Sequence, residues 1–240
     1  MKKVWVGLVV GLLAMLTISL CGWARSYAVY YDCSSTRDTG LVVMNSGGGD
    51  TYYTIKIYDA YGSLLEAVSG DLSGYQSAYY RLSGLIEWGD TTWGLVLIET
   101  PGLLTIGVET FDEDVWLASD NVVSTIPPNA EYTAYWYGLN YANTSTQQTL
   151  CVVVNPNDVS VEGTLFFYDS LGNMQERIDF ALDPHEADFY RSPDLFDVDE
   201  TLWGVFDVRG NAPLLVAVEY YNAEGMLLNV DQMAYAYFIE

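Results

Sequence analysis

Histidine and cysteine are scarce in this sequence, and their scarcity excludes several kinds of chemistry. The 240 residues include one His and three Cys. A zinc site needs a cluster of His and Cys ligands, so none is predicted. Catalysis by a Ser or Cys nucleophile needs a nearby base, most often His. The one His, His185, lies in the polar, turn-like segment 182–188, where a surface position is expected. We therefore expect a protein without enzymatic activity.

Basic residues are also few. The chain has nine Lys and Arg against 32 Asp and Glu, which gives a formal net charge of −23. A surface this acidic repels nucleic acid and anionic lipid headgroups, and it favours cations, basic partners and solubility. Nucleic acid is therefore not an expected partner.

Helical periodicity is missing from the sequence after residue 28. No window of eleven or more residues there has apolar residues spaced as on one face of a helix. Apolar residues alternate instead, and Gly, Asp and Asn mark turns between the runs. This pattern predicts about seven strands in the second half of the chain, near 149–155, 161–169, 173–181, 186–191, 201–208, 213–222 and 226–238.

The N-terminus is predicted to be a targeting segment. Lys2 and Lys3 precede an apolar run over 4–20, and small residues follow at 22, 24, 26 and 28, which is the layout of a secretory signal peptide over 1–28. An uncleaved anchor over 4–24 is the alternative, because that run is long enough to span a bilayer. The membrane would then be contacted through this segment alone. Either way we expect export, to the periplasm, the cell surface or the extracellular space.

Two segments repeat each other at a spacing of 110 residues. When 41–110 is compared with 151–220 without a gap, 18 of the 70 pairs are identical, where chance would give roughly five. Outside this range the likeness is looser: 26–32 resembles 131–137, and 117–121 resembles 228–232 after a one-residue slip. The identical pairs include Asn45/Asn155, Tyr58/Tyr168, Asp59/Asp169, Gly62/Gly172, Trp93/Trp203, Gly94/Gly204 and Glu109/Glu219.

The repeat predicts the domain organisation. A hairpin-rich sheet buries one face by folding over a second sheet, and about 100 residues make one such sandwich. We expect a signal helix over 1–28, a β-sandwich over 29–126, a connector over 127–130 and a second β-sandwich over 131–240. Because Pro127 and Pro128 stiffen the connector, we expect an elongated pair with a semi-rigid joint.

A Trp-Gly pair opens the same apolar strand in both copies. Gly94, Val96 and Ile98 match Gly204, Phe206 and Val208, and all six are apolar, so they are expected to face inward. The other face admits a charge, because Leu97 is matched by Asp207. We expect Trp93 and Trp203 at the less buried face or its rim, with a core position as the alternative.

Matched charges and crowded carboxylates suggest further sites. Arg81 with Glu109, and Arg191 with Glu219, are predicted to form structural ion pairs between strands, with a carboxylate site as the alternative. No cofactor is expected, because acidic clusters of this kind are typical of solvated turns. Calcium is the alternative, since such clusters offer hard oxygen ligands. The candidate calcium ligands are Asp194, Asp197, Asp199 and Glu200.

Aromatic residues are abundant, with 20 Tyr and seven Trp. They favour sheet packing, but a platform for sugar rings is an alternative. Cys33 and Cys151 form a disulfide in an oxidising compartment under one hypothesis, and Cys151 is a free, buried residue under the other. The candidate ligand-binding residues are Trp93, Trp203, Tyr135, Trp136 and Tyr137.

Three motifs occur in both copies: an Asn at a strand end, a Tyr-Asp-x-x-Gly turn and the Trp-Gly strand. Together they resemble the tandem Ig-like β-sandwich repeats of exported bacterial proteins. The resemblance implies an all-β fold and export, and no activity. We expect a binding or structural protein whose partners are proteins or polysaccharides at the cell surface, or further copies of itself. The alternatives are a carbohydrate-binding module and a hydrolase with a carboxylate site.

Overall fold

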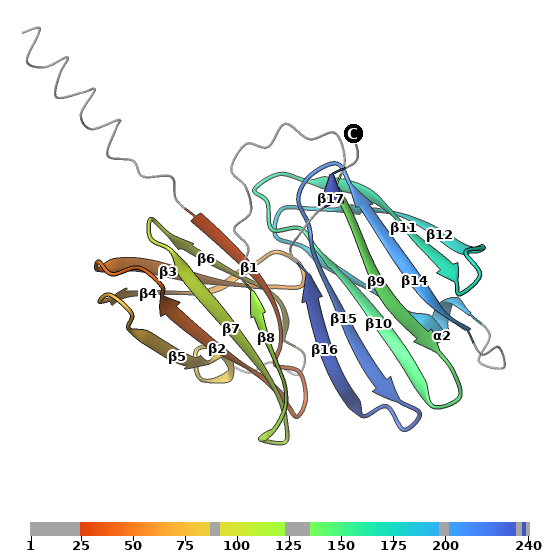
Figure 1. Cartoon of the computed structure of the whole chain (residues 1–240), viewed down its shortest axis with the longest axis horizontal. Coiled ribbons are helices and arrows are strands. Elements are labelled where there is room, and N and C mark those ends of the chain that lie inside the picture. Colours follow the sequence, from red (N-terminus) through yellow and green to blue (C-terminus); the bar gives the residue numbers. More distant parts are fainter. Residues whose placement is uncertain (1–24, 87–91, 123–134, 197–201, 234–236, 239–240) are drawn as a thin grey trace, which may run out of the picture.

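The computed structural model of the chain is all-β, which confirms this part of the predicted fold class (Figure 1). It describes residues 25–86, 92–122, 135–196, 202–233 and 237–238. Most of the predicted signal segment and the whole predicted connector lie outside these residues, so the domain boundaries stay predictions. Among the described residues, no helix has the length and hydrophobicity needed to cross a membrane.

The first sandwich consists of two antiparallel four-stranded sheets. The first inner sheet has the strand order β1-β6-β3-β4, and the first outer sheet has the order β5-β2-β7-β8. Their facing sides enclose an apolar core that includes Tyr27, Ile55, Val96 and Ile106. A 3-10 helix, η1, spans Leu82–Gly84. The strands are β1 (Arg25–Asp32), β2 (Arg37–Asn45), β3 (Thr51–Asp59), β4 (Leu64–Leu72), β5 (Ser77–Arg81), β6 (Trp93–Thr100), β7 (Leu104–Asp112) and β8 (Val115–Val122).

The second sandwich repeats this arrangement. The second inner sheet has the order β13-β10-β15-β16, and the second outer sheet has the order β12-β11-β14-β9-β17. Tyr137, Leu165, Phe206 and Val216 are among its core residues, and the short helix α2 spans Ser192–Leu195. The strands are β9 (Tyr135–Asn143), β10 (Gln147–Val154), β11 (Val161–Asp169), β12 (Met174–Leu182), β13 (Ala187–Arg191), β14 (Leu202–Gly210), β15 (Leu215–Asn222), β16 (Leu227–Met233) and β17 (Tyr237–Phe238).

The repeated Asn holds the same turn together in both sandwiches. Asn45 Nδ2 donates to the carbonyls of Gly49 and Ser73, at 2.7 and 3.1 Å. Asn155 Nδ2 donates in the same way to Val159 and Asp183, both at 2.8 Å. These side chains are buried, so each amide satisfies backbone carbonyls that would otherwise lack a partner.

The Trp-Gly strand needs its glycine because a neighbouring backbone passes close to it. A Cβ on Gly94 would lie 2.5 Å from the carbonyl oxygen of Tyr58, and one on Gly204 would lie 1.9 Å from that of Tyr168. Both carbonyls belong to the Tyr-Asp-x-x-Gly turn, which ends the strand paired with the Trp-Gly strand. The two repeated motifs are therefore the two sides of one contact.

The repeat begins earlier than the sequence comparison placed it. Tyr27 Oη accepts a hydrogen bond from Leu104 N–H at 3.0 Å, and Tyr137 Oη accepts one from Leu214 N–H at 2.7 Å. Tyr27 and Tyr137 are 110 residues apart, and so are their partners Leu104 and Leu214. Strand β1 therefore corresponds to β9. The predicted match of 26–32 with 131–137 is therefore wrong. The one-residue slip near the end of each copy is confirmed, because Val108 pairs with Asp120 and Val218 pairs with Asp231.

Candidate functional site

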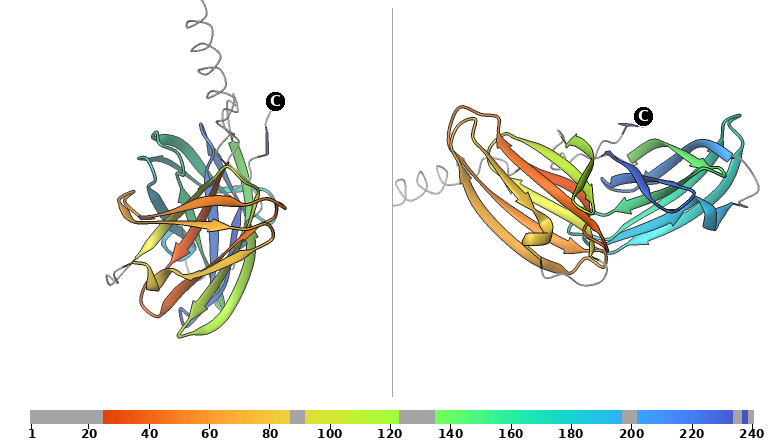
Figure 2. Two further views of the ribbon diagram at one scale, coloured as in Figure 1. Left: turned by 90° about the vertical axis from the view of Figure 1, so that its left-hand side faces the viewer. Right: turned by 90° about the horizontal axis from the view of Figure 1, so that it is seen from below.

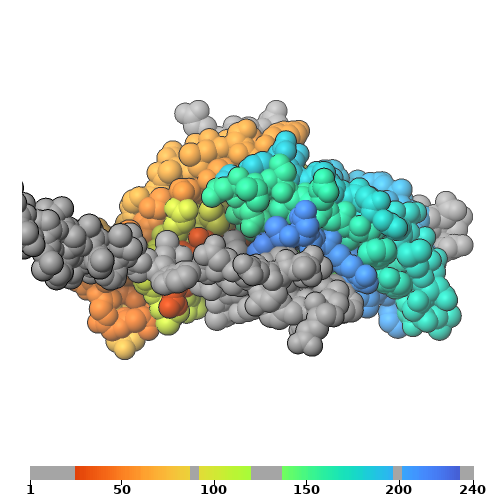
Figure 3. Space-filling model, turned by 90° about the horizontal axis from the view of Figure 1, so that it is seen from above, coloured from red at the N-terminus to blue at the C-terminus, as the bar shows by residue number. Residues whose placement is uncertain are grey.

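The two inner sheets pack against each other and form a third apolar core (Figure 1, Figure 2). Seen as a space-filling surface, the two sandwiches form one continuous body (Figure 3). From the sequence we expected the prolines of the connector to fix the two sandwiches relative to each other. The structure shows that packing between the two inner sheets also holds them together. The buried residues of this third core are Ala28, Tyr30, Tyr58, Leu95, Leu97, Val152, Val154, Ala187, Leu215, Ala217, Leu227 and Val230.

The alternation of side chains along β6 explains how one strand serves two cores. Val96 and Ile98 point into the first sandwich, as predicted, while Leu95 and Leu97 point into the third core. Neither pair is exposed by more than 6%. A strand that is apolar on both faces is typical of a sheet that is covered on both sides, which accounts for the unbroken apolar run after Trp93.

A turn of each sandwich joins the edge of this interface. The N–H of Ala187 donates to the carbonyl of Ala60 at 2.9 Å, and Tyr61 forms an isolated antiparallel bridge with Glu186. The ring of His185 lies 4.2 Å from that of Tyr58. His185 is thus largely covered by the other sandwich, and the predicted surface position is wrong. Its local sequence is polar, but the first sandwich supplies the ring that covers it.

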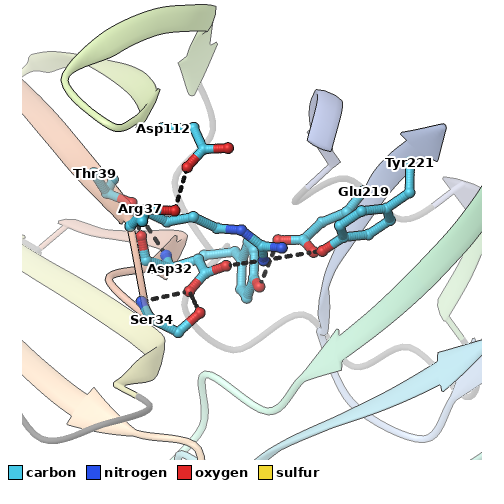
Figure 4. Close-up of polar contacts among 9 residues, drawn as sticks. Asp32, Ser34, Arg37, Thr39, Asp112, Glu219 and Tyr221 are labelled. Atoms are coloured by element: carbon cyan, nitrogen blue, oxygen red, sulfur yellow. Dashed lines mark hydrogen bonds and ion pairs between the residues drawn. The ribbon is translucent and has the colours of Figure 1, made fainter. Parts of the chain in front are cut away.

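Glu219 lies fully buried where the two sandwiches meet (Figure 4). The hydroxyl of Tyr30 donates to its Oε1 at 2.9 Å, and the hydroxyl of Tyr221 donates to its Oε2. Arg37 Nη1 lies 3.6 Å from Oε2 and also pairs with Asp32. Residues of both sandwiches therefore satisfy this carboxyl group, which would otherwise be costly to bury.

Burial raises the pKa of Glu219, and the nearby Asp32 carboxylate raises it further, although the hydrogen bond from Tyr221 and the charge of Arg37 lower it. Because the pKa is higher in the folded than in the unfolded state, this group stabilises the fold most below its ordinary pKa of about 4.5. That stabilisation is lost as the pH rises from the unfolded-state pKa to the folded-state pKa of Glu219. The loss is about 1.4 kcal/mol for each pH unit between these two values.

Glu219→Gln is therefore expected to flatten the pH dependence of stability. In denaturant titrations between pH 5 and pH 8, the wild type should lose more free energy of unfolding than the variant does. Repulsion among the other carboxylates is common to both proteins and cancels in the difference. Parallel pH profiles of the two proteins would show that Glu219 ionises as freely in the folded state as in the unfolded state.

A crevice of about 350 Å³ opens beside Glu219, between the sandwiches. Part of its lining is aromatic: Trp93 contacts Phe189 edge to face, with 5.7 Å between ring centroids, and Tyr30 at 6.4 Å. Polar side chains line it as well, namely Asp32, Arg37, Arg191 and Glu219. Pockets that bind small molecules combine apolar walls with a few polar groups in this way.

The position predicted for Trp93 is confirmed. It is half-buried at the rim and packs over Phe189 of the other sandwich. Trp203, its counterpart, is 61% exposed on the second outer sheet. Tyr137 is fully buried in the core of the second sandwich, so its prediction as a ligand-binding residue is wrong. Tyr135 and Trp136 lie in β9, but their side chains are outside the described part of the chain.

The predicted Arg-Glu pairs are replaced by other pairs. Arg81 Nε lies 2.6 Å from Asp38 Oδ2, and its Nη2 lies 3.1 Å from Asp114. The predicted bridge to Glu109 is therefore wrong, although the two residues flank Gly40 in register.

In the second sandwich, Arg191 and Glu219 flank Leu150 in the same way. Within the described ranges, however, the ion pair of Glu219 is with Arg37 of the first sandwich. Arg191 is exposed at the crevice, and no ion pair links it to another described residue.

Cys33 and Cys151 are free, and each is buried in the core of a different sandwich. The hypothesis of a disulfide between Cys33 and Cys151 is thus wrong, and the alternative of a free, buried Cys151 is confirmed. Burial raises the pKa of both thiols, which makes them poor nucleophiles.

The calcium prediction is not tested by the structure. Asp194 lies in α2, and Asp197, Asp199 and Glu200 lie outside the described residues. Within the described residues, no group of three or more His, Cys, Asp or Glu side chains is arranged to hold a metal ion.

Sequence reasoning missed Tyr30, Asp32, Arg37 and Tyr221. Tyr30 and Glu219 are 189 residues apart in the chain, so no local pattern links them. One signal was present: Arg37 is one of only nine basic residues, and a rare cation in an acidic chain is a strong candidate for a buried ion pair.

Comparisons with known proteins show only weak likenesses. No protein-family model matches the sequence, and no curated protein matches it. A β-glucuronidase of glycoside hydrolase family 2 is 8% identical, with a TM-score of 0.21, over 88% of this chain and 24% of that chain. A putative β-galactosidase from Bacteroides fragilis is 11% identical, with a TM-score of 0.19, over 88% of this chain and 32% of that one.

The PBSX exported protein XepA is 10% identical, with a TM-score of 0.25, over 81% of each chain. This chain spans about a quarter of the length of the β-glucuronidase that it matches. At these TM-scores, the likenesses give no support to any activity, substrate or partner.

Proposed function

We propose that this protein is an exported, non-enzymatic binding protein, built from two Ig-like sandwiches that arose by duplication and act as one body. The crevice between the inner sheets is its binding site. The observation that carries this proposal is the position of Arg191, an exposed basic residue that lines the same crevice as the aromatic pair of Trp93 and Phe189. The sequence features of export and repetition support the rest of the proposal.

The chemistry of the crevice favours a saccharide with a carboxylate group. Trp93 and Phe189 offer apolar ring surface against which the CH face of a sugar packs. Arg191 offers a planar, bidentate donor that suits a carboxylate. Acidic sugars have both features, and they are abundant outside cells. A protein of net charge −23 repels such a ligand at long range, so moderate affinity is expected.

A catalytic role has less support from the same geometry. Glycoside hydrolysis needs one carboxyl group as an acid and a second as a nucleophile or base. The two carboxyl groups that line the crevice, Asp32 and Glu219, both contact the guanidinium of Arg37. They are held by one cation, and Glu219 also accepts hydrogen bonds from two Tyr hydroxyls. This arrangement suits a structural lock between the sandwiches.

Calorimetric titration with oligogalacturonate, and with a neutral cello-oligosaccharide as the comparison, tests the proposal. We expect heat and a change in tryptophan fluorescence with the uronate, and weaker binding of the neutral sugar. Arg191→Ala should weaken uronate binding about tenfold, because it removes a charged hydrogen bond of about 1.4 kcal/mol or more.

Two variants serve as controls for that titration. Arg177→Ala removes an exposed guanidinium from the second outer sheet and should bind like the wild type. Trp203→Ala removes the exposed aromatic ring outside the crevice and should also bind normally. The proposed site would be contradicted if Arg191→Ala bound the uronate as tightly as the wild type, or if the wild type bound no sugar. Loss of binding in Trp203→Ala would instead place the site on the second outer sheet.

A further inference from the structure

The interface within the chain joins two different kinds of sheet. The first sandwich contributes its Trp-Gly sheet, β1-β6-β3-β4, and the second contributes the sheet β13-β10-β15-β16. At the spacing of 110 residues, the Trp-Gly sheet of the first sandwich corresponds to the second outer sheet, β12-β11-β14-β9-β17. The second inner sheet, β13-β10-β15-β16, corresponds to the first outer sheet, β5-β2-β7-β8. The packing is therefore head to tail, and it uses one sheet of each kind.

Within the described ranges, no further sheet packs on the outward face of one sheet of each kind, namely the first outer and the second outer sheet. The three cores fix the order of the layers as first outer, first inner, second inner and second outer sheet, so the uncovered faces lie at opposite ends of the molecule (Figure 2). A head-to-tail contact that does not close on itself can be repeated without limit.

We propose that a second copy of this chain docks on the second outer sheet through its own first outer sheet, in the way the two sandwiches pack within one chain. Repeated docking gives an open linear assembly. This inference does not depend on the crevice or on its ligand, because both faces lie outside the crevice.

Exposed aromatic residues occupy the two faces at the matching places. Within the chain, Trp93 packs on Phe189 with 5.7 Å between ring centroids. Their counterparts at the spacing of 110 are Trp203, which is 61% exposed, and Tyr79, which is 50% exposed. Docking a second copy would place Trp203 of one chain on Tyr79 of the next. Large exposed aromatic side chains are enriched at sites of protein association.

The turns that join the sandwiches also have unused counterparts. Within the chain, Tyr61 forms an antiparallel bridge with Glu186. The counterpart of Tyr61 is Leu171, which is 85% exposed, and the counterpart of Glu186 is Gln76.

The backbone of these turns is preserved as well. Gly62 and Gly172 have φ values of 78° and 84°, and Tyr75 and His185 have 62° and 64°. Non-glycine residues rarely adopt such positive φ values, so the match between Tyr75 and His185 shows that both copies have the same turn. The backbone that makes the bridge within the chain is therefore available at each end.

Contacts between copies are expected to be weaker than those within the chain. Leu97, Leu150 and Leu215 of the third core correspond to Asp207, Gly40 and Thr105 of the outer sheets, and of these Asp207 and Gly40 are themselves buried. Less apolar surface is buried by such a contact. Assembly should thus depend on protein concentration and be favoured where copies accumulate.

Disulfide trapping tests the proposed register. In antiparallel pairs the Cα atoms are about 4.5 to 5.5 Å apart, within the range of a disulfide. The full chain is solubilised in mild detergent in a Cys21→Ser background, which leaves only the two buried thiols. With Leu171→Cys and Gln76→Cys in one chain, mild oxidation should give a ladder of linked copies on a non-reducing gel.

Matched variants separate this contact from other kinds of association. Leu171→Cys or Gln76→Cys alone should give no ladder, but a mixture of the two should give a dimer. Adding Trp203→Lys should reduce the ladder at least tenfold, while Tyr52→Lys, which changes an equally exposed aromatic residue on another face, should not. The proposal is overturned if the double variant stays monomeric, if either single cysteine variant forms as much dimer as the mixture, or if Trp203→Lys leaves the ladder intact.

Discussion

Replacing Ala217 with Asp is expected to lower the free energy of unfolding by about 3 to 4 kcal/mol and to separate the two sandwiches. Ala217 is fully buried in the third core, between the inner sheets. A carboxylate there either stays buried without a partner or reaches water by forcing the sheets apart. Its neighbour on the same face of β15 is Glu219, so the new carboxylate also lies beside another acidic group.

Two measurements check this prediction. The melting temperature should fall by roughly 6 to 16 °C, given about 2 to 4 °C for each kcal/mol in a chain of this size. Small-angle scattering below the melting temperature should show an increased radius of gyration, because each sandwich keeps its own core. Ala67→Asp makes the same change on the exposed strand β4 and should have little effect. An unchanged radius and melting temperature would contradict the proposed third core.

Replacing Gly204 with Ala is expected to destabilise the second sandwich by about 2 to 4 kcal/mol. The added Cβ would lie 1.9 Å from the carbonyl oxygen of Tyr168, a distance at which strand β11 or β14 must move. Because these two strands pair along their length, the movement would disturb the ladder hydrogen bonds of the second outer sheet.

Gly94→Ala should produce the same loss in the first sandwich, where the Cβ would lie 2.5 Å from the carbonyl oxygen of Tyr58 and where φ is 152°. Gly49→Ala provides the control, because no atom lies within 4 Å of the added Cβ; its effect should stay within about 0.5 kcal/mol. Chemical denaturation of the three variants gives the comparison. If Gly204→Ala and Gly49→Ala were equally stable, close backbone approach would not explain the repeated Trp-Gly pair.

Much of the architecture followed from alternation and repetition. The seven strands predicted for the second copy correspond to β10 to β16, because apolar residues at a spacing of two and turn residues between them are local signals. The strand before them, β9, was missed. Its sequence is Tyr-rich and lacks a clear alternation, and the comparison of 26–32 with 131–137 placed it five residues out of register.

The candidate site was predictable only in part. The repeat singled out Glu219 and Arg191, and both line the crevice. Their partners were predicted within the same sandwich, because matched residues suggest matched contacts. The structure shows that the same position has a different environment in each copy: Glu109 lies on an outer sheet, whereas Glu219 is covered by the other sandwich. A duplicated sequence cannot reveal which of its two copies is covered.

The sequence by itself determined the all-β class, the repeat and the inward faces of the strands, because side-chain alternation and turn chemistry act over a few residues. Only the tertiary structure decided that the two inner sheets pack face to face, that Arg37 reaches Glu219, and that Cys33 and Cys151 lie in separate cores. These contacts join residues more than 100 positions apart. They depend on how two complete surfaces fit together, and that fit is a property of the folded shape.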